Sequence, residues 1–253
     1  MSQLIEYQSE PKRLLLTWEP PLGVKGRTRW IVGELALNGQ IAEFRYLVDD
    51  EFTLANNGRP EAELRASGYF GYPAFDSRAA SFPVFREHVL EAFLRRLPPP
   101  SRSDYGSYLA HFRIPPHAEL SPLSLLGATE ARLPGDGFCL IDPLDPGQSF
   151  CDVVLEVAGH RHYPQSREGL KGREGASLQL VSEPDHAHDT HAVRVEIDGA
   201  VIGYVNRVQS PTISQWLVTR DVQASLLRLN GSSQKPRAFI FVSVRPGAEQ
   251  KAA

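Results

Sequence analysis

The sequence predicts two domains, an α+β domain followed by a mainly-β small barrel with one or two helices. Its 253 residues exceed the usual size of a single domain, which is about 100–200 residues. Residues 142–149 contain two Pro and one Gly, a composition typical of a linker. Strand and helix patterns are mixed before this stretch, whereas short strand patterns follow one another after it. We therefore expect domains at residues 1–148 and 149–253, with a disordered tail at residues 247–253.

The first domain opens with a predicted antiparallel meander. Residues 13–18 and 29–37 are apolar runs typical of strands, and residues 41–47 alternate between apolar and polar side chains, as a half-buried strand does. Asn38-Gly39 is a strong signal for a two-residue hairpin turn between the second and third strands.

Helix patterns follow in the same domain. Residues 85–97 place an apolar side chain at every fourth position, and Pro98 ends this helix. Residues 103–112 and 121–126 predict two further helices. The combination of a small meander with helices defines the α+β class expected for this domain.

The second domain reads as a series of short strands. Residues 192–197 alternate cleanly, and the turn signal Asp198-Gly199 leads into a return strand at residues 200–205. Residues 210–217 predict a helix with Ser210 as its N-cap and Pro211 in its first turn. The other predicted strands are residues 152–159, 178–181, 222–229 and 238–244. This pattern is typical of a barrel of about 100 residues.

Charge and hydropathy exclude several classes of protein. A net charge of -3 argues against a protein that holds duplex DNA by bulk charge. Residues 1–150 carry a net of -4 and residues 151–253 a net of +1. The mean hydropathy of -0.28 and the lack of a long apolar run or a signal peptide predict no membrane contact. The two cysteines, Cys139 and Cys151, make no secreted disulfide framework, so we expect a cytoplasmic protein.

Histidines in the second domain raise the alternative of a metal site. His160 and His162 are expected to share one face of a strand, because side chains alternate along a strand. The stretch from His186 to His191 departs from the zinc-hydrolase pattern His-x-His-x-Asp-His, because its Asp stands one residue too early. In this alternative, the metal would be held by members of the set His160, His162, His186, His188, Asp189 and His191. Zn²⁺ would suit the histidines, and Glu183, Asp185 and Asp189 could hold Mg²⁺ as a nuclease site does. The preferred interpretation has no cofactor.

Motifs for covalent catalysis are missing from the sequence. It contains neither a Gly-x-Ser-x-Gly nucleophile elbow nor a Gly-x-x-x-x-Gly-Lys-Ser/Thr phosphate loop. Cys139 and Cys151 have no basic neighbour in sequence, so buried structural thiols are expected. We assign no catalytic residue and expect a protein that is not an enzyme.

Three segments of the second domain keep the order and spacing of one known family. They are residues 157–163 (Val-Ala-Gly-His-Arg-His-Tyr), 178–195 (Leu-Gln-Leu-Val-Ser-Glu-Pro-Asp-His-Ala-His-Asp-Thr-His-Ala-Val-Arg-Val) and 202–207 (Ile-Gly-Tyr-Val-Asn-Arg). Over residues 152–245 the chain resembles the HIRAN domain, which also occurs in helicase-like DNA-repair translocases. The resemblance implies an OB-like barrel that captures the free 3′ end of single-stranded DNA.

The resemblance also implies roles for individual residues. His162 and Tyr163 fall at the aromatic pair that stacks on terminal bases, and Asp189, with the His188 backbone, falls where the family accepts a hydrogen bond from the 3′-hydroxyl. Arg161 and Arg207 would contact phosphates, and Phe239 would complete the base pocket. The full set of implied DNA-binding residues is Arg161, His162, Tyr163, His186, His188, Asp189, Tyr204, Arg207 and Phe239. The chain departs from the family where His162 replaces a tyrosine, His186 an asparagine and His188 an aromatic residue.

The first domain resembles the N-terminal subdomain of HipA-type toxin kinases over residues 13–142. The matching features are Trp18, residues 32–35 (Val-Gly-Glu-Leu), residues 44–46 (Phe-Arg-Tyr), the helix ending at Leu97-Pro98, Arg102 with Asp104, and residues 121–127 (Ser-Pro-Leu-Ser-Leu-Leu-Gly). No kinase core follows, so the resemblance implies a module that contacts a protein partner and performs no phosphotransfer.

The combined interpretation is a cytoplasmic bacterial protein that binds single-stranded DNA, at free 3′-hydroxyl ends, in DNA repair or in defence against mobile elements. One alternative is a metal-dependent hydrolase or nuclease that uses the His/Asp cluster. Another is a toxin–antitoxin interaction protein that binds no DNA. The sequence leaves the oligomeric state, the protein partner and the choice between DNA and RNA open.

Overall fold

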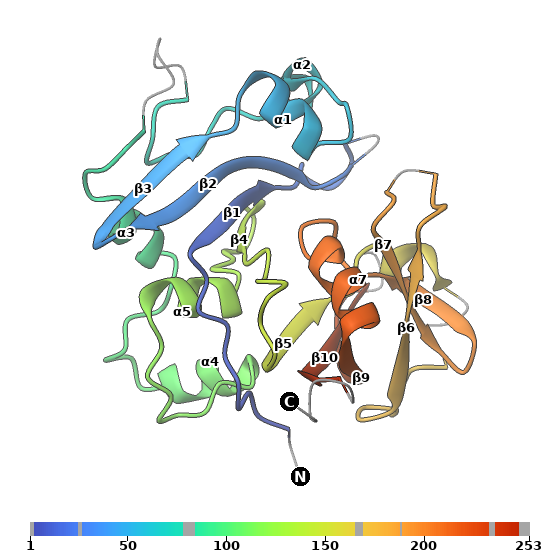
Figure 1. Cartoon of the computed structure of the whole chain (residues 1–253). Coiled ribbons are helices and arrows are strands. Elements are labelled where there is room, and N and C mark those ends of the chain that lie inside the picture. The colour runs from blue at the N-terminus through green and yellow to red at the C-terminus, as the bar shows by residue number, and fades with distance from the viewer. Residues whose placement is uncertain are drawn as a thin grey trace. The chain divides into compact units, whose positions relative to one another are not determined.

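The computed structural model describes residues 3–24, 27–77, 84–164, 169–187, 189–232 and 236–247. The chain divides into two compact units, whose elements are labelled in Figure 1. The N-terminal unit contains Glu10–Leu109 and His117–Pro143, and the C-terminal unit contains Leu144–Ala253 together with Met1–Ser9 and Ala110–Pro116. The domain bounds 1–148 and 149–253 stay predictions. So does the disordered tail, of which only Gly247 lies within the described residues.

The N-terminal unit is built on an antiparallel sheet, in which four strands of the described chain pair in the order β3-β2-β1-β4. The strands are β1 (Arg13–Trp18), β2 (Trp30–Asn38), β3 (Ile41–Tyr46) and β4 (Phe138–Ile141). The first three confirm the predicted meander, whereas β4 was not predicted. The hairpin turn consists of Gly39 and Gln40, one residue later than expected, because Asn38 still pairs with Ile41.

Short helices connect these strands. They are α1 (Asp49–Ala55), α2 (Glu61–Ala66), α3 (Val89–Leu94), α4 (Tyr105–His111) and α5 (Pro122–Ala128). α3 is shorter than the predicted helix at residues 85–97, because Phe85 instead exchanges two backbone hydrogen bonds with Phe44, of 3.0 and 2.8 Å. The predicted helix after Ser121 is confirmed, and the Ser121 hydroxyl caps it by accepting from the Ser124 amide at 3.1 Å.

The C-terminal unit contains a six-stranded antiparallel sheet, as far as the described residues show, in the order β5-β10-β9-β6-β7-β8. Its strands are β5 (Cys151–Glu156), β6 (Ser177–Glu183), β7 (Ala192–Ile197), β8 (Ala200–Tyr204), β9 (Arg220–Gly231) and β10 (Pro236–Pro246). All six predicted strands are confirmed, and Figure 1 shows the long β9–β10 hairpin beside β5.

A backbone bridge closes this sheet into a barrel. Just past the end of β5, the Ala158 amide donates to the Tyr204 carbonyl at 2.7 Å, and the Tyr204 amide donates back at 2.9 Å. The bridge needs a glycine at position 203, because a Cβ there would lie 2.5 Å from the Ala158 carbonyl oxygen. The predicted fold class, an α+β part followed by a mainly-β OB-like barrel, is confirmed.

The interior of the barrel is apolar, and strand alternation decides which side chains face it. Val193, Val195 and Ile197 of β7 point inward, as do Ile240 and Val242 of β10. Helix α7 (Ser210–Thr219) contributes the fully buried Trp216 to the same core. α7 confirms the predicted helix, but Gln209 and not Ser210 precedes its first turn, and no side chain caps it. The side chains between the inward positions therefore form an outer surface.

The N-terminal segment of the chain is attached to the C-terminal unit by a buried carboxylate. Asp152 Oδ2 accepts from the backbone amides of Glu6 and Tyr7 at 3.0 and 3.1 Å. Its Oδ1 accepts from the Ser243 hydroxyl at 2.9 Å and lies 2.8 Å from Arg245 Nη2. Only 4% of Asp152 is exposed, so each of these partners compensates the cost of burying its charge.

No helix among the described residues has the length and apolar character that crossing a membrane requires.

Replacing Asp152 by Ala is expected to lower the free energy of unfolding by about 3 kcal/mol, because the Arg245 guanidinium and two amides lose a buried partner. Urea denaturation of the full chain measures this. Asp221→Ala removes the same charge from an exposed position of β9 and is expected to change stability by less than about 0.5 kcal/mol. Equal effects of the two substitutions would contradict the role of Asp152.

Candidate functional site

Three of the predicted binding residues meet on the outer surface of the barrel beside β8. Tyr204 pairs with Arg194, which alternates with the inward-facing Val193 and Val195, so the Tyr204 side chain also points outward. The His186 ring lies 5.4 Å from the Tyr204 ring at an angle of 56°, and the Tyr163 phenol interacts with the Tyr204 phenol. We call Tyr163, His186 and Tyr204 the aromatic platform; each of them is half-buried.

The surroundings of Tyr204 keep its phenol protonated. Burial raises the pKa of Tyr204 to about 12, and the Glu183 carboxylate and the Tyr163 phenol raise it as well. At neutral pH Tyr204 is therefore an uncharged hydrogen-bond donor. Its ring combines an apolar face with a polar tip, as ligand-binding tyrosines commonly do.

Arg194, which stands opposite Tyr204 in the sheet, is already neutralised. Arg194 donates to Glu183, and its Nε lies 2.5 Å from Glu196 Oε1. A guanidinium that is shared by two carboxylates is a poor partner for a phosphate. Sequence reasoning missed this triad: the alternation of residues 192–197 places Arg194 and Glu196 on one face, but no signal in the sequence shows that Glu183 joins them.

Asp189 connects the loop after β6 to the start of α7. Its Oδ1 accepts from the His191 amide at 2.8 Å, and its Oδ2 accepts from the Ser210 hydroxyl at 3.2 Å. Asp189 is half-buried. Each carboxylate oxygen has two lone pairs, so this residue can hold its loop and still accept one further hydrogen bond per oxygen.

The prediction that His160 and His162 share one face of a strand is wrong. Gly159 adopts a φ of 71° and leads the chain into the 3-10 helix η1 (His160–His162), so His160 and His162 do not share one face of a strand. His160 is buried, with Nδ1 at 2.8 Å from the Ile202 carbonyl oxygen. Arg161 Nε donates to His162 Nε2 at 3.1 Å. His160 therefore has a structural partner, whereas His162 is exposed.

The described part of the chain contains no cluster of metal-ligating side chains that would support the metal alternative. No group of three or more His, Cys, Asp or Glu side chains is arranged there to hold an ion. His188, which belongs to both the implied DNA-binding set and the metal alternative, lies outside the described residues. A metal site that includes His188 stays a prediction.

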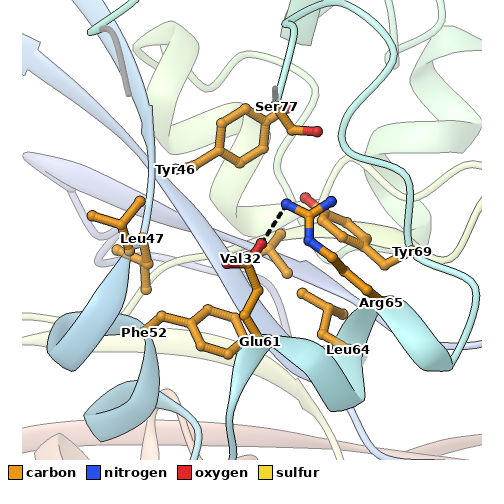
Figure 2. A pocket seen from close by; sticks show the side chains of 10 residues that line it. Val32, Tyr46, Leu47, Phe52, Glu61, Leu64, Arg65, Tyr69 and Ser77 are labelled. Atoms are coloured by element: carbon orange, nitrogen blue, oxygen red, sulfur yellow. Dashed lines mark hydrogen bonds and ion pairs between the residues drawn. The ribbon is translucent and has the colours of Figure 1, made fainter. Parts of the chain in front are cut away.

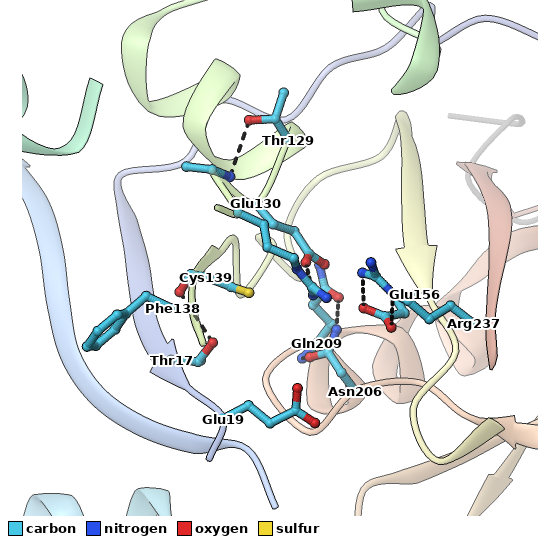
Figure 3. Close-up of polar contacts among 12 residues, drawn as sticks. Thr17, Glu19, Thr129, Glu130, Phe138, Cys139, Glu156, Asn206, Gln209 and Arg237 are labelled. Carbon is cyan, nitrogen blue, oxygen red and sulfur yellow. Dashed lines mark hydrogen bonds and ion pairs between the residues drawn. The ribbon is translucent and has the colours of Figure 1, made fainter. Parts of the chain in front are cut away.

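Arg207 lies at the tight turn between β8 and α7. The Asn206 side chain organises this turn, because its Oδ1 accepts from the Val208 and Gln209 amides at 3.0 and 3.3 Å and its Nδ2 donates to Gln209 (Figure 3). Arg207 is half-buried, and its carbonyl oxygen accepts from the Ser210 hydroxyl at 3.3 Å. Asp189 and Arg207 thus share Ser210 as a neighbour.

Phe239 does not contact the aromatic platform, as far as the described residues show. It points outward from β10, between the inward-facing Ala238 and Ile240, and is 8% exposed. The guanidinium carbons of Arg228 and Arg237 lie 4.3 and 4.9 Å from its ring centre. Arg237 also forms a two-pronged ion pair with Glu156, at 2.6 and 2.7 Å, as Figure 3 shows. In this structure, cations and not open solvent surround the Phe239 ring.

Two hollows in the described chain are lined by residues outside the aromatic platform. The N-terminal unit has a cavity of about 10 Å³ among the side chains in Figure 2, where Arg65 pairs with Glu61. This volume is no larger than one water needs. A groove of about 360 Å³ in the C-terminal unit is lined by Pro146, His191, Pro211, Thr212, Ser214, Gln215 and Val218.

Comparison with known proteins identifies the barrel. Residues 151–238 match the family model of the HIRAN domain, so this segment is a HIRAN domain. Among solved structures, the HIRAN domain of human HLTF is similar at 13% identity and a TM-score of 0.32, over 40% of this chain and 80% of that one. A protein from Lactobacillus plantarum is similar at 19% identity and a TM-score of 0.32, over 38% and 96%. No curated protein matches the chain.

Asp189 supports its loop as well as offering free lone pairs, and two substitutions separate these roles. Asp189→Ala is expected to lower the free energy of unfolding by about 1–2 kcal/mol, because the His191 amide loses its acceptor and the Ser210 hydroxyl keeps only the Arg207 carbonyl. Asp189→Asn keeps one side-chain oxygen and is expected to lose less than half as much. Urea denaturation of both variants is the measurement, and equal losses would show that the negative charge, rather than the acceptor, holds the loop.

Proposed function

We propose that the HIRAN domain of this chain binds single-stranded DNA on its aromatic platform, with a free 3′-hydroxyl end beside Asp189. The observation that carries this proposal is the meeting of Tyr163, His186 and Tyr204 on the outer surface of the barrel, at the positions where the family motif implies contacts to DNA. The family match supports DNA binding as the role of the domain.

Stacking supplies the main attraction in this proposal. A base stacked on an aromatic side chain contributes about 1–3 kcal/mol and is accepted whatever its sequence, because every base has a π-face. His186 and Tyr204 are inclined at 56° to each other and so are not stacked as a parallel pair. Tyr163 and Tyr204 also carry hydroxyl groups that can donate to base edges or to phosphate oxygens.

Asp189 would provide selectivity for the end of the strand. A carboxylate accepts a hydrogen bond from a terminal 3′-hydroxyl, and it repels a terminal 3′-phosphate. The unused lone pairs of Asp189 make this compatible with its bonds to His191 and Ser210. Arg161 and Arg207 would contact phosphates near the end. The proposed site binds and positions DNA and performs no bond-breaking step.

The N-terminal unit would serve as a protein-contact module, as its resemblance to the HipA-type subdomain implies. Leu54 and Phe70 support this role, because each is 80% exposed, and large exposed apolar side chains are common where a partner binds. The bacterial source, the cytoplasmic location and the place in repair or defence stay predictions.

Fluorescence anisotropy with three labelled DNAs tests the proposed function: a single strand with a 3′-hydroxyl, its twin with a 3′-phosphate, and a blunt duplex. The full chain is expected to bind the first most tightly. Tyr163→Ala is expected to weaken that binding by about 1–3 kcal/mol, or about 5- to 150-fold, through the loss of one stacking surface. Tyr105→Ala, a half-buried tyrosine of the N-terminal unit, is the matched control.

Each part of the proposal has its own contrary outcome. Equal affinity for the 3′-hydroxyl and 3′-phosphate strands would contradict end selection at Asp189. Equal losses in Tyr163→Ala and Tyr105→Ala would contradict the aromatic platform. Absence of binding would favour the interaction protein without DNA, and cleavage of an end-labelled strand with Zn²⁺, Mg²⁺ or Mn²⁺ would favour the nuclease alternative.

A further inference from the structure

A second group of charged side chains lies on the outer surface of the barrel, away from the motif positions. It comprises Arg228 on β9, Arg237 on β10, and His111 and Arg113 on the stretch Ala110–Pro116, which belongs to the C-terminal unit. Arg228 Nη1 donates to the His111 carbonyl oxygen at 2.8 Å. We call Arg113, Arg228 and Arg237 the arginine cluster.

The arginine cluster has too few acceptors in the described structure. Arg237 is paired with Glu156. Arg228 Nε and Nη2 are buried and find no hydrogen-bond partner among the described residues. Arg113 is half-buried. Among the described residues, its guanidinium has no carboxylate and no other hydrogen-bond partner. Of the three guanidinium groups, only that of Arg237 is paired with a carboxylate among the described residues, an arrangement that an anion would stabilise.

Electrostatics agree with this geometry. Burial, followed by the charges of Arg113 and Arg237, lowers the pKa of Arg228 to about 10. Burial and the charges of Arg228, Arg237 and Arg113 also lower the pKa of His111. Each group is thus disfavoured in its charged form by the positive charge around it. A bound phosphate would reverse that effect, because it supplies the missing negative charge.

The sheet register places Arg228 and Arg237 on the same outer surface as the aromatic platform. Phe239 stands opposite Arg228 on one side and Glu156 on the other, and Ala158, two residues after Glu156, stands opposite Tyr204. Phe239, Glu156, Ala158 and Tyr204 all alternate with inward-facing residues. Strands are spaced by about 4.8 Å, so β10 and β8 are separated here by about 10 Å across the end of β5.

We propose that Arg113 and Arg228 form a phosphate-binding site that holds the backbone of a single strand whose 3′ end occupies the aromatic platform. The proposal rests on the proposed function, and it adds a second contact point several nucleotides from the end. Arg237 fixes the Phe239 ring beside this site through its pair with Glu156. The path therefore runs from Tyr204 across the end of β5 to β9.

A nucleic acid fits this site better than an acidic peptide does. Arg228 and Arg237 lie against the Phe239 ring, on a surface that also carries the three aromatic side chains of the platform. Alternating phosphates and bases match such a surface. Guanidinium groups also bind phosphate oxygens in a fork, through two parallel hydrogen bonds. An acidic peptide or free phosphate remains a distinguishable outcome of the experiment below.

The test compares two oligothymidines with 3′-hydroxyl ends, of about 4 and about 16 nucleotides, the range covered by one such barrel. Affinity is measured by anisotropy at several salt concentrations on the full chain. Arg113→Gln and Arg228→Met are the test variants. Arg173→Gln removes the same charge from an exposed pair with Asp198 and is the matched control. Tyr163→Ala reports on the platform separately.

The long strand is expected to bind about ten-fold more weakly to each test variant, and its salt slope is expected to fall by about 0.7, the value for one lost phosphate contact on a single strand. The short strand is expected to bind all three arginine variants alike. Arg228→Met is also expected to keep or raise the melting temperature, because it removes buried nitrogens without partners. A structural arginine would give a lower melting temperature instead.

Several results would overturn the arginine cluster site. One is an unchanged affinity and salt slope for the long strand in both test variants while Tyr163→Ala weakens binding, which leaves the proposed function intact. The reverse pattern, in which only the test variants weaken binding, contradicts the platform and the shared path together. Competition by inorganic phosphate or polyglutamate equal to that by the long strand would assign the site to a free anion or an acidic peptide.

Discussion

Two backbone hydrogen bonds between Ala158 and Tyr204 close the barrel, and the candidate site depends on that closure. The bridge sets the outward direction of Tyr204, so that its ring meets His186 and its phenol meets Tyr163. It also requires a glycine at position 203, where a side chain would strike the facing backbone. Binding surfaces on small barrels are formed by side chains on the outside of a closed sheet, because the inside is filled.

The closure also places His160, His162 and His186 in different environments. The chain turns at Gly159 directly after the bridge, and this turn buries His160 against the Ile202 carbonyl while leaving His162 exposed. His186 lies on the other side of Tyr204, on the loop that Asp189 holds to α7. Residues that look like one cluster in the sequence are therefore spread over a buried structural position and a surface. Metal coordination needs side chains that converge on one point, whereas stacking on successive bases of single-stranded DNA needs side chains spread over a surface.

Local patterns in the sequence predicted the strands well and the site in part. Alternation at residues 192–197 and the turn at Asp198-Gly199 are sufficient for β7 and β8, because one face of each strand must be apolar. α1 and α2 were missed because Val48 and Pro60 precede them without a side-chain cap. The strand-face prediction for His160 failed because Gly159 changes the chain direction. Arg228 was missed because its neighbours at His111 and Arg113 lie more than 100 residues away in sequence.

The net charge of the whole chain does not decide whether a local site on it binds DNA. The net charge of -3 suggests repulsion of DNA, yet interactions between exposed charges are largely screened beyond about 8 Å at physiological salt. A phosphate near β9 therefore responds to Arg113, Arg228, Arg237 and Glu156 rather than to the acidic side chains elsewhere. Two buried nitrogens of Arg228, Nε and Nη2, have no hydrogen-bond partner among the described residues, and a bound phosphate would offset part of the cost of burying them. The proposed site depends on these local charges, and it is therefore compatible with a chain whose net charge is negative.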